Sequence, residues 1–106
     1  MKTSILARHL KEARLRLDVT QEKLSVLAGI DEFSASARMN QYEKGKHSPH
    51  YQIVTKLASV LNVTATYFYS DDDLEAEMLL EFARLKPQQK TETLEFIRQF
   101  VKNGVD

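Results

Sequence analysis

The stretch TQEKLSVLAGI, residues 20–30, carries the signals of a short helix with a defined beginning and end. Thr20 is a favourable N-cap, because its hydroxyl can accept a hydrogen bond from a backbone N–H of the first turn. Gly29 supplies the stop, since glycine adopts the left-handed conformation that ends many helices. We therefore predict a helix over 21–28, with three inward-facing side chains, those of Leu24, Leu27 and Ala28.

A second stretch, SASARMNQYEKGKHSP at residues 34–49, predicts a helix of different character. Small residues come first, two amides follow, and charged residues precede the glycine stop and the proline, so the helix should run from about 35 to 44. Successive residues advance by about 100°, which divides the helix into two sides. One side carries Ala35, Met39 and Tyr42; the other carries Ala37, Asn40, Gln41 and Lys44, with Arg38 on the flank. This helix should pack through one side and present small and polar groups on the other.

The rest of the chain also has helical periodicity, without the alternation of a strand. Further helices are expected over 4–17, 50–61, 64–69 and 72–85, and from Pro87 onward. The apolar residues expected on their inward faces are Leu6, Leu10, Ala13, Leu17, Val54, Leu57, Ala58, Leu61, Tyr67 and Phe68. The last two helices carry their own stripes, Leu74, Met78, Phe82 and Leu85, then Leu94, Ile97 and Val101 beside Phe96 and Phe100. Seven helices make the expected fold class all-α.

Composition limits the class of protein. A chain of 106 residues that is 42% hydrophobic can bury one compact core. The absence of cysteine excludes disulfides, thiolate zinc sites and a cysteine nucleophile. Charged residues interrupt the N-terminal apolar positions, and no stretch approaches a membrane span. We expect a soluble cytoplasmic protein.

Charge is distributed unevenly along a chain whose net charge is zero. Residues 1–50 hold nine Lys/Arg and six Asp/Glu, a net +3, whereas residues 51–106 hold six and nine, a net −3. A basic first half and an acidic second half suggest a polyanion for one face and a different partner for the other.

The ordered motifs resemble the phage repressor and Cro family of helix-turn-helix proteins, also called the xenobiotic-response-element family. The resemblance covers residues 10–63 and rests on Leu10 and Arg14, TQEKLSVLAGI, MNQYEKGKHSP and LASVLNV. It implies a five-helix lambda-repressor-like DNA-binding domain over 1–70. Residues 71–106 would then form a C-terminal helical extension, for which we expect a role in dimerisation.

The resemblance also implies which residues contact double-stranded DNA. Gln21 matches a phosphate-contacting glutamine, helped by the positive end of its helix. Ser36, Ala37 and Gln41 match base-contacting positions, and glutamine can pair bidentately with adenine. Arg38 and Asn40 are neighbours suited to the DNA backbone, and Lys44 and Lys46 can reach phosphates. The expected DNA-binding residues are Gln21, Ser36, Ala37, Arg38, Asn40, Gln41, Lys44 and Lys46.

Further expectations concern the residues around the helix predicted over 35–44. Arg14 and Glu43 match positions that form an internal ion pair in the family. Gly29 and Glu43 are fourteen steps apart where the family ordinarily has ten, so the turn around DEFS is enlarged by four residues. Asp31 and Glu32 would repel phosphate, and we expect them to cap the following helix or to face away.

The sequence offers less support for other classes of function. His47 and His50, with His9 elsewhere, make a poor metal site and are interpreted as surface histidines. No catalytic motif is present, so no enzyme activity, cofactor or metal is expected. The expected function is repression or autoregulation by a homodimer. The alternative is an antitoxin or another protein-interaction module that binds a protein partner through the C-terminal helices.

Overall fold

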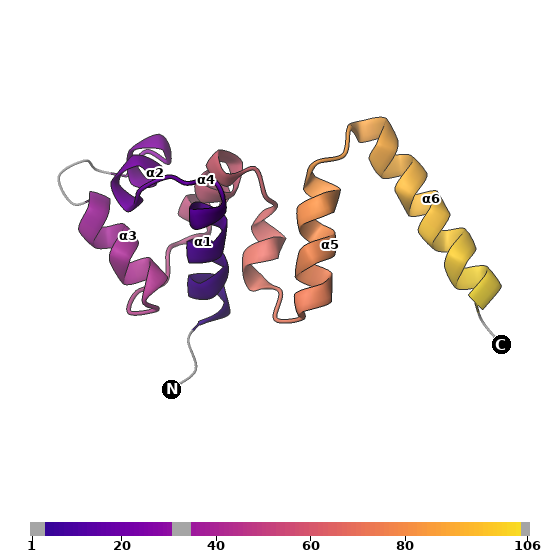
Figure 1. The fold of residues 1–106 in the computed structure, drawn as a ribbon, viewed down its shortest axis with the longest axis horizontal. Helices are drawn as coiled ribbons and strands as arrows, with labels where there is room; N and C mark the ends of the chain where they lie inside the picture. Colours follow the sequence, from indigo (N-terminus) through magenta and orange to yellow (C-terminus); the bar gives the residue numbers. More distant parts are fainter. Residues whose placement is uncertain (1–3, 31–34, 105–106) are drawn as a thin grey trace.

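The computed structural model describes residues 4–30 and 35–104. These residues form α1 (Ile5–Arg16), α2 (Gln21–Leu27), α3 (Ala35–Glu43), α4 (Tyr51–Leu61), the 3-10 helix η2 (Ala65–Tyr69), α5 (Asp73–Ala83) and α6 (Pro87–Gly104), with no strand among them (Figure 1). The predicted all-α fold class is confirmed. No helix in the described ranges combines the length and apolar character needed to cross a membrane.

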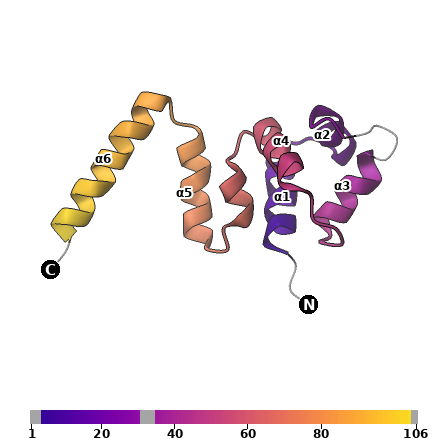
Figure 2. The same ribbon diagram turned by 180° about the vertical axis from the view of Figure 1, so that it is seen from behind.

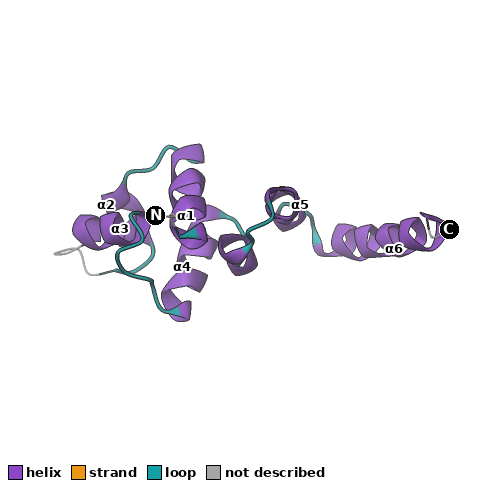
Figure 3. Ribbon diagram, turned by 90° about the horizontal axis from the view of Figure 1, so that it is seen from below, coloured by secondary structure: helices purple, strands orange, loops and turns teal. Residues whose placement is uncertain are grey.

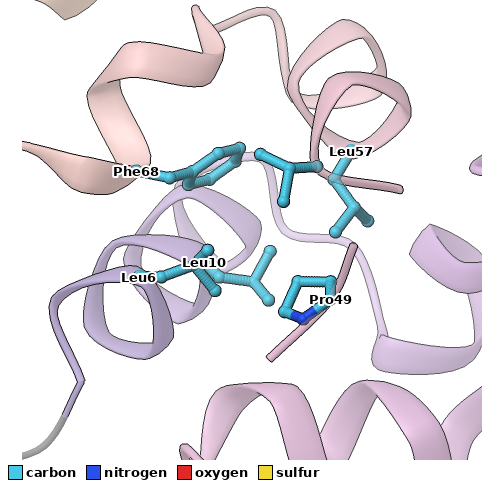
Figure 4. Close-up of a pocket in the computed structure, with 6 residues that line it drawn as sticks. Leu6, Leu10, Pro49, Leu57 and Phe68 are labelled. Atoms are coloured by element: carbon cyan, nitrogen blue, oxygen red, sulfur yellow. The ribbon is translucent and has the colours of Figure 1, made fainter. Parts of the chain in front are cut away.

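The first five elements pack around one core. α3 lies against α1 and α2, and η2 lies against α1 and α4. Leu10, Leu24, Met39, Leu57 and Phe68 are almost completely buried there. Figure 4 shows Leu6 and Leu10 of α1 converging with Leu57, Phe68 and Pro49, which precedes α4. The apolar residues of these helices therefore meet in one core, and this packing fixes the position of α2 and α3.

The helix ends follow local chemistry. The Thr20 hydroxyl accepts from the backbone N–H of Lys23 at 3.0 Å, and Thr64 caps η2 in the same way. Gly29 and Gly45 have φ of +79° and +73°, the left-handed conformation expected at helix ends. The predicted stops at both glycines are confirmed.

Two leucines expected in the core lie at the surface instead. Leu27 is 52% exposed, because α2 turns Leu24, Ser25 and Ala28 inward and thereby rotates Leu27 away. Leu17 is 48% exposed because α1 ends at Arg16 and the chain reverses at Asp18, which has a φ of +56°.

The interpretation of His9 as a surface histidine is wrong. Its side chain is buried, its Nε2 lies 2.7 Å from the carbonyl oxygen of Ser70, and its ring centroid lies 4.5 Å from that of Tyr67. Ser70 and Tyr67 are remote from His9 in sequence, so the helical pattern of α1 does not predict that they cover it. His47 and His50 are exposed.

α5 and α6 extend the molecule beyond this core, giving dimensions of 55 × 34 × 23 Å. α5 packs against η2 and buries Ala76 in the core, while Arg8 Nη2 donates to Asp73 Oδ1 at 3.2 Å. α6 diverges from α5, and none of its residues is buried. Figures 2 and 3 show from two further directions that α6 extends away from the first four helices.

Candidate nucleic-acid interface

α3 is divided between a buried side and an exposed side. Met39, Tyr42 and Glu43 are buried. The exposed residues are Ser36, Ala37, Arg38, Gln41 and Lys44, with Asn40 half-buried at the boundary. The predicted orientation of Met39 and Tyr42 is therefore confirmed. A helix held this way presents two small side chains, one amide and two cations on its outer surface.

An ion pair between α1 and α3 holds the buried side. Arg14 Nη2 donates to Glu43 Oε1 at 3.0 Å, and its Nε donates to Oε2 of the same carboxylate. Arg14 Nη1 also donates to the carbonyl oxygen of Val19 at 2.8 Å. Hydrogen bonding to Glu43 raises the pKa of Arg14, although burial acts in the opposite direction. The predicted internal pair is confirmed, and it fixes the rotation of α3 relative to α1.

Gln21 connects this pair to the front of α3. As the first residue of α2 it is half-buried, and its Nε2 donates to Glu43 Oε1 at 3.2 Å and to Asn40 Oδ1 at 3.3 Å. The amide thus bridges α2 and α3 at the edge of the exposed surface. Two of the expected DNA-contacting residues, Gln21 and Asn40, lie side by side.

The end of α3 carries the two lysines. The backbone N–H of Lys46 donates to the carbonyl of Gln41 at 3.0 Å, and that of Gly45 donates to Tyr42 at 3.1 Å, the pattern of a helix closed by a left-handed glycine. A Cβ added to Gly45 would lie 3.5 Å from the Cβ of Ser4. The turn therefore packs against the start of α1 and leaves both lysines exposed.

The exposed charges near α3 favour an anion. Arg38, Lys44 and Lys46 are exposed, whereas the carboxylate of Glu43 is buried and paired. A surface with these exposed cations, on which the carboxylate of α3 is paired with Arg14, attracts phosphates. Asp31 and Glu32, for which a capping or outward orientation is expected, lie outside the described residues, as does the rest of the enlarged turn.

The sequence does not reveal how the polar residues of this surface are connected. The side chains of Gln21 and Asn40 hydrogen-bond to each other across nineteen positions. No short-range pattern contains this contact, because it depends on how α2 and α3 cross. The ion pair that orients both residues was found through the resemblance, since its members are 29 positions apart.

Comparisons with known proteins agree with this geometry. The model of the helix-turn-helix family matches residues 10–68, which span α1 through most of η2. The crystal structure of the transcriptional regulator BswR is similar to this chain, with 46% sequence identity and a TM-score of 0.79. The similarity covers 88% of this chain and 92% of the BswR chain. No curated protein matches the sequence.

Proposed function

This chain belongs to the Cro/C1-type helix-turn-helix family of DNA-binding transcriptional regulators, and on that premise we propose that it is a sequence-specific repressor or autoregulator. The observation that carries the proposal is the division of α3 into a buried side and a polar exposed side. A major groove about 12 Å wide admits a helix whose leading residues are small or polar. α3 would enter this groove and read base edges.

The exposed residues of α3 divide into readers of bases and holders of the DNA backbone. Ser36, Ala37 and Gln41 would face the base pairs, since small groups allow close approach and an amide can both donate and accept. Arg38, Lys44 and Lys46 would meet phosphates. These contacts supply affinity that falls with salt but carries no sequence information.

Gln21 and Asn40 would act at the edge of the same surface. The Gln21 amide lies at the N-terminus of α2, where backbone N–H groups favour an anion. Its hydrogen bonds to Glu43 and Asn40 already hold it in place. Both N–H donors of the amide are engaged in these bonds, so a phosphate contact would replace one of them. The position of Gln21 at the N-terminus of α2 favours it as that contact, with Asn40 beside it.

Homodimerisation through residues 71–106 completes the proposal. One helix-turn-helix domain contacts a single half-site, and a twofold dimer doubles the contacts on a symmetric operator. The apolar side chains exposed along α5 and α6 support a role of this extension in assembly.

The test is selection of bound duplexes from a random pool, with the salt dependence of binding measured on the selected sequence. We expect the selected duplexes to contain one half-site motif as an inverted repeat, and the affinity of the chain for them to fall steeply with salt. Recovery of no preferred sequence at any salt concentration would overturn it.

A second candidate function is an antitoxin or another protein-interaction module that binds through the C-terminal helices. The same exposed apolar faces of α5 and α6 favour it. A small protein that co-purifies in a fixed ratio and is released by changes confined to α6 would support this candidate. A chain that purifies as a self-associated species and still selects DNA supports the regulator.

A further inference from the structure

α5 carries two apolar faces where a surface helix ordinarily has one. The face toward the domain carries buried Ala76 and partly buried Leu79 and Leu80. At about 100° per residue the opposite face carries Leu74, Met78 and Phe82. These three side chains are 67%, 56% and 40% exposed. This second face, the outer face of α5, remains largely exposed in the described part of the chain.

α6 borders this face without closing over it. A groove of about 880 Å³ lies between the two helices, lined by the outer face of α5 and by Thr93 and Ile97 of α6. The ammonium of Lys90 lies 5.0 Å from the ring centroid of Phe82, near the start of α6. Beyond that point the helices diverge, as Figure 1 shows, and Phe100 is 70% exposed. The apolar face of α6 is therefore open as well.

The exposed apolar surface approaches that of a stable interface. Of the fourteen large hydrophobic side chains exposed in the described ranges, eight lie on α5 and α6. The three phenylalanines among them alone leave on the order of 350 Å² open, and five aliphatic side chains add to it. A stable interface buries about 800 Å² on each partner. Contiguous apolar surface beyond a few hundred Å² marks an interaction site.

The charges of the two helices indicate what fills the groove. α5 carries Asp73, Glu75, Glu77 and Glu81 and no Lys or Arg. α6 has a net charge of +1, from Lys90, Arg98 and Lys102 against Glu92 and Glu95. Two α5 helices placed face to face would repel each other, whereas Lys90, which shares the apolar side of α6 with Ile97 and Phe100, attracts α5. The complement to each exposed face is therefore present on the same chain.

We infer that each groove receives α6 from a second copy of this chain, so that the two copies exchange α6 reciprocally about a twofold axis. The exchange covers the outer face of α5 and the apolar face of α6 in one step. It satisfies the self-complementarity of a twofold interface, since α5 of each copy meets α6 of the other. This inference rests on the proposed homodimeric regulator and adds the site and pairing of its interface.

Sedimentation of the full chain without DNA tests the site. Met78→Glu and Phe100→Glu place a carboxylate on the two faces of the groove, and both positions are exposed, so the fold of the first five elements should persist. Leu15→Glu makes the same kind of change on α1, where the side chain is 57% exposed. Wild type and Leu15→Glu should be dimers at about 10 μM, while the other two variants dissociate at least about tenfold more readily. A Met78→Glu protein that dimerises as wild type does would overturn the inference.

Charge reversal tests the pairing of α5 with the partner's α6. One variant carries Glu77→Arg and Glu81→Arg, and the other carries Lys90→Glu, which reverses the cation on the apolar side of α6. Each alone should dimerise more weakly, by about tenfold, because like charges then meet across the interface. A 1:1 mixture should regain dimers, since both contacts of the mixed pair are attractive. A mixture no better than its components would refute reciprocal exchange, as would α5 reversals without effect.

These measurements are separable from the DNA-reading proposal. A monomeric Met78→Glu protein keeps α3 intact and should retain base preference on a single half-site. If the wild type dimerises through the groove but selects no sequence, the proposal of a sequence-specific regulator is refuted and the groove interface is supported. If the groove variants dimerise normally and the wild type selects a sequence, the groove interface is refuted and the regulator is supported.

Discussion

The five-element domain and the α5–α6 extension contain similar apolar residues, but the domain buries them and the extension leaves them exposed. In the domain, Phe68 is 1% exposed and packs with residues from several helices. In α6, Phe100 is 70% exposed and its ring makes one aromatic contact, to Phe96 at 6.2 Å. The same side chain stabilises the fold in one place and remains available for contact in the other. Hydrophobic periodicity therefore identifies an apolar face but not what covers it.

Polar interactions differ between the two regions in the same way. The Arg14–Glu43 pair has side chains 11% and 3% exposed and is supported by Gln21. The ion pair of Arg98 with Glu95 in α6 is 3.7 Å long, with side chains 66% and 58% exposed. Water screens the second pair but hardly reaches the first. The domain is thus the rigid part that orients α3, and the extension has little internal stabilisation of its own.

The largest expected effect compares the two phenylalanines. Phe68→Ala should destabilise the chain by about 3 to 5 kcal/mol, because it opens a cavity in the core. Phe100→Ala should change the free energy of unfolding by less than about 0.5 kcal/mol where the chain is monomeric, because its side chain is mostly in water. Urea denaturation of both variants at submicromolar concentration measures the difference. Equal losses would show that α6 is packed as tightly as the core.

Removal of one partner from each ion pair gives the next effect. Glu43→Ala should cost about 3 kcal/mol, because it leaves the buried Arg14 guanidinium unpaired, whereas Glu95→Ala should cost less than about 1 kcal/mol. Thermal and urea unfolding compare the two.

The pH dependence of the Glu43→Ala loss follows from the sign of the Arg14 shift. A raised folded pKa gives stability that is present below the unfolded pKa and is lost only as the pH rises through the folded value. The loss should therefore be the same at pH 7 and pH 9. Replacing both partners with apolar residues, as in Arg14→Met/Glu43→Leu, should cost less than Glu43→Ala; a larger cost would mean that the pair itself, not the unpaired charge, dominates.

Base reading by α3 comes third. Gln41→Ala should weaken binding by about 1 to 3 kcal/mol per half-site and relax preference at one base pair, because an amide can form two hydrogen bonds to a base edge. Gln99→Ala is the matched control, since Gln99 is an exposed glutamine on α6 bonded to Glu95. Competition binding to the selected operator and its single-base variants provides the measurement. An unchanged ranking of operator variants would mean that the rotation of α3 on DNA differs from the one proposed.

The smallest effect concerns backbone contact. Lys46→Ala should weaken binding to every duplex alike and lower the salt slope by about one per contact, because an ammonium meets phosphate without reading bases. Lys86→Ala removes the same charge from the exposed turn between α5 and α6 and should leave both quantities unchanged. Binding at two salt concentrations separates the variants. Reordering of operator preference by Lys46→Ala would place Lys46 among the base readers.

Local signals predicted most of the secondary structure. Thr20 and Thr64 accept hydrogen bonds from residues three positions ahead, and Gly29 and Gly45 adopt left-handed conformations. Such contacts lie within one helical turn, so a short stretch of sequence contains both partners. Where the sequence failed, as at Leu27 and His9, the deciding neighbours lie elsewhere in the chain.

The sequence by itself determined the helices, their ends and the two-sided character of α3, because caps, left-handed glycines and 3.6-residue periodicity act within a few residues. The resemblance added the pairing of Arg14 with Glu43. Only the tertiary structure decided that Gln21 bonds to Asn40, that His9 is buried against Ser70, and that the outer faces of α5 and α6 remain open. Each of these depends on how helices remote in sequence approach one another, and that approach is set by packing of the whole core.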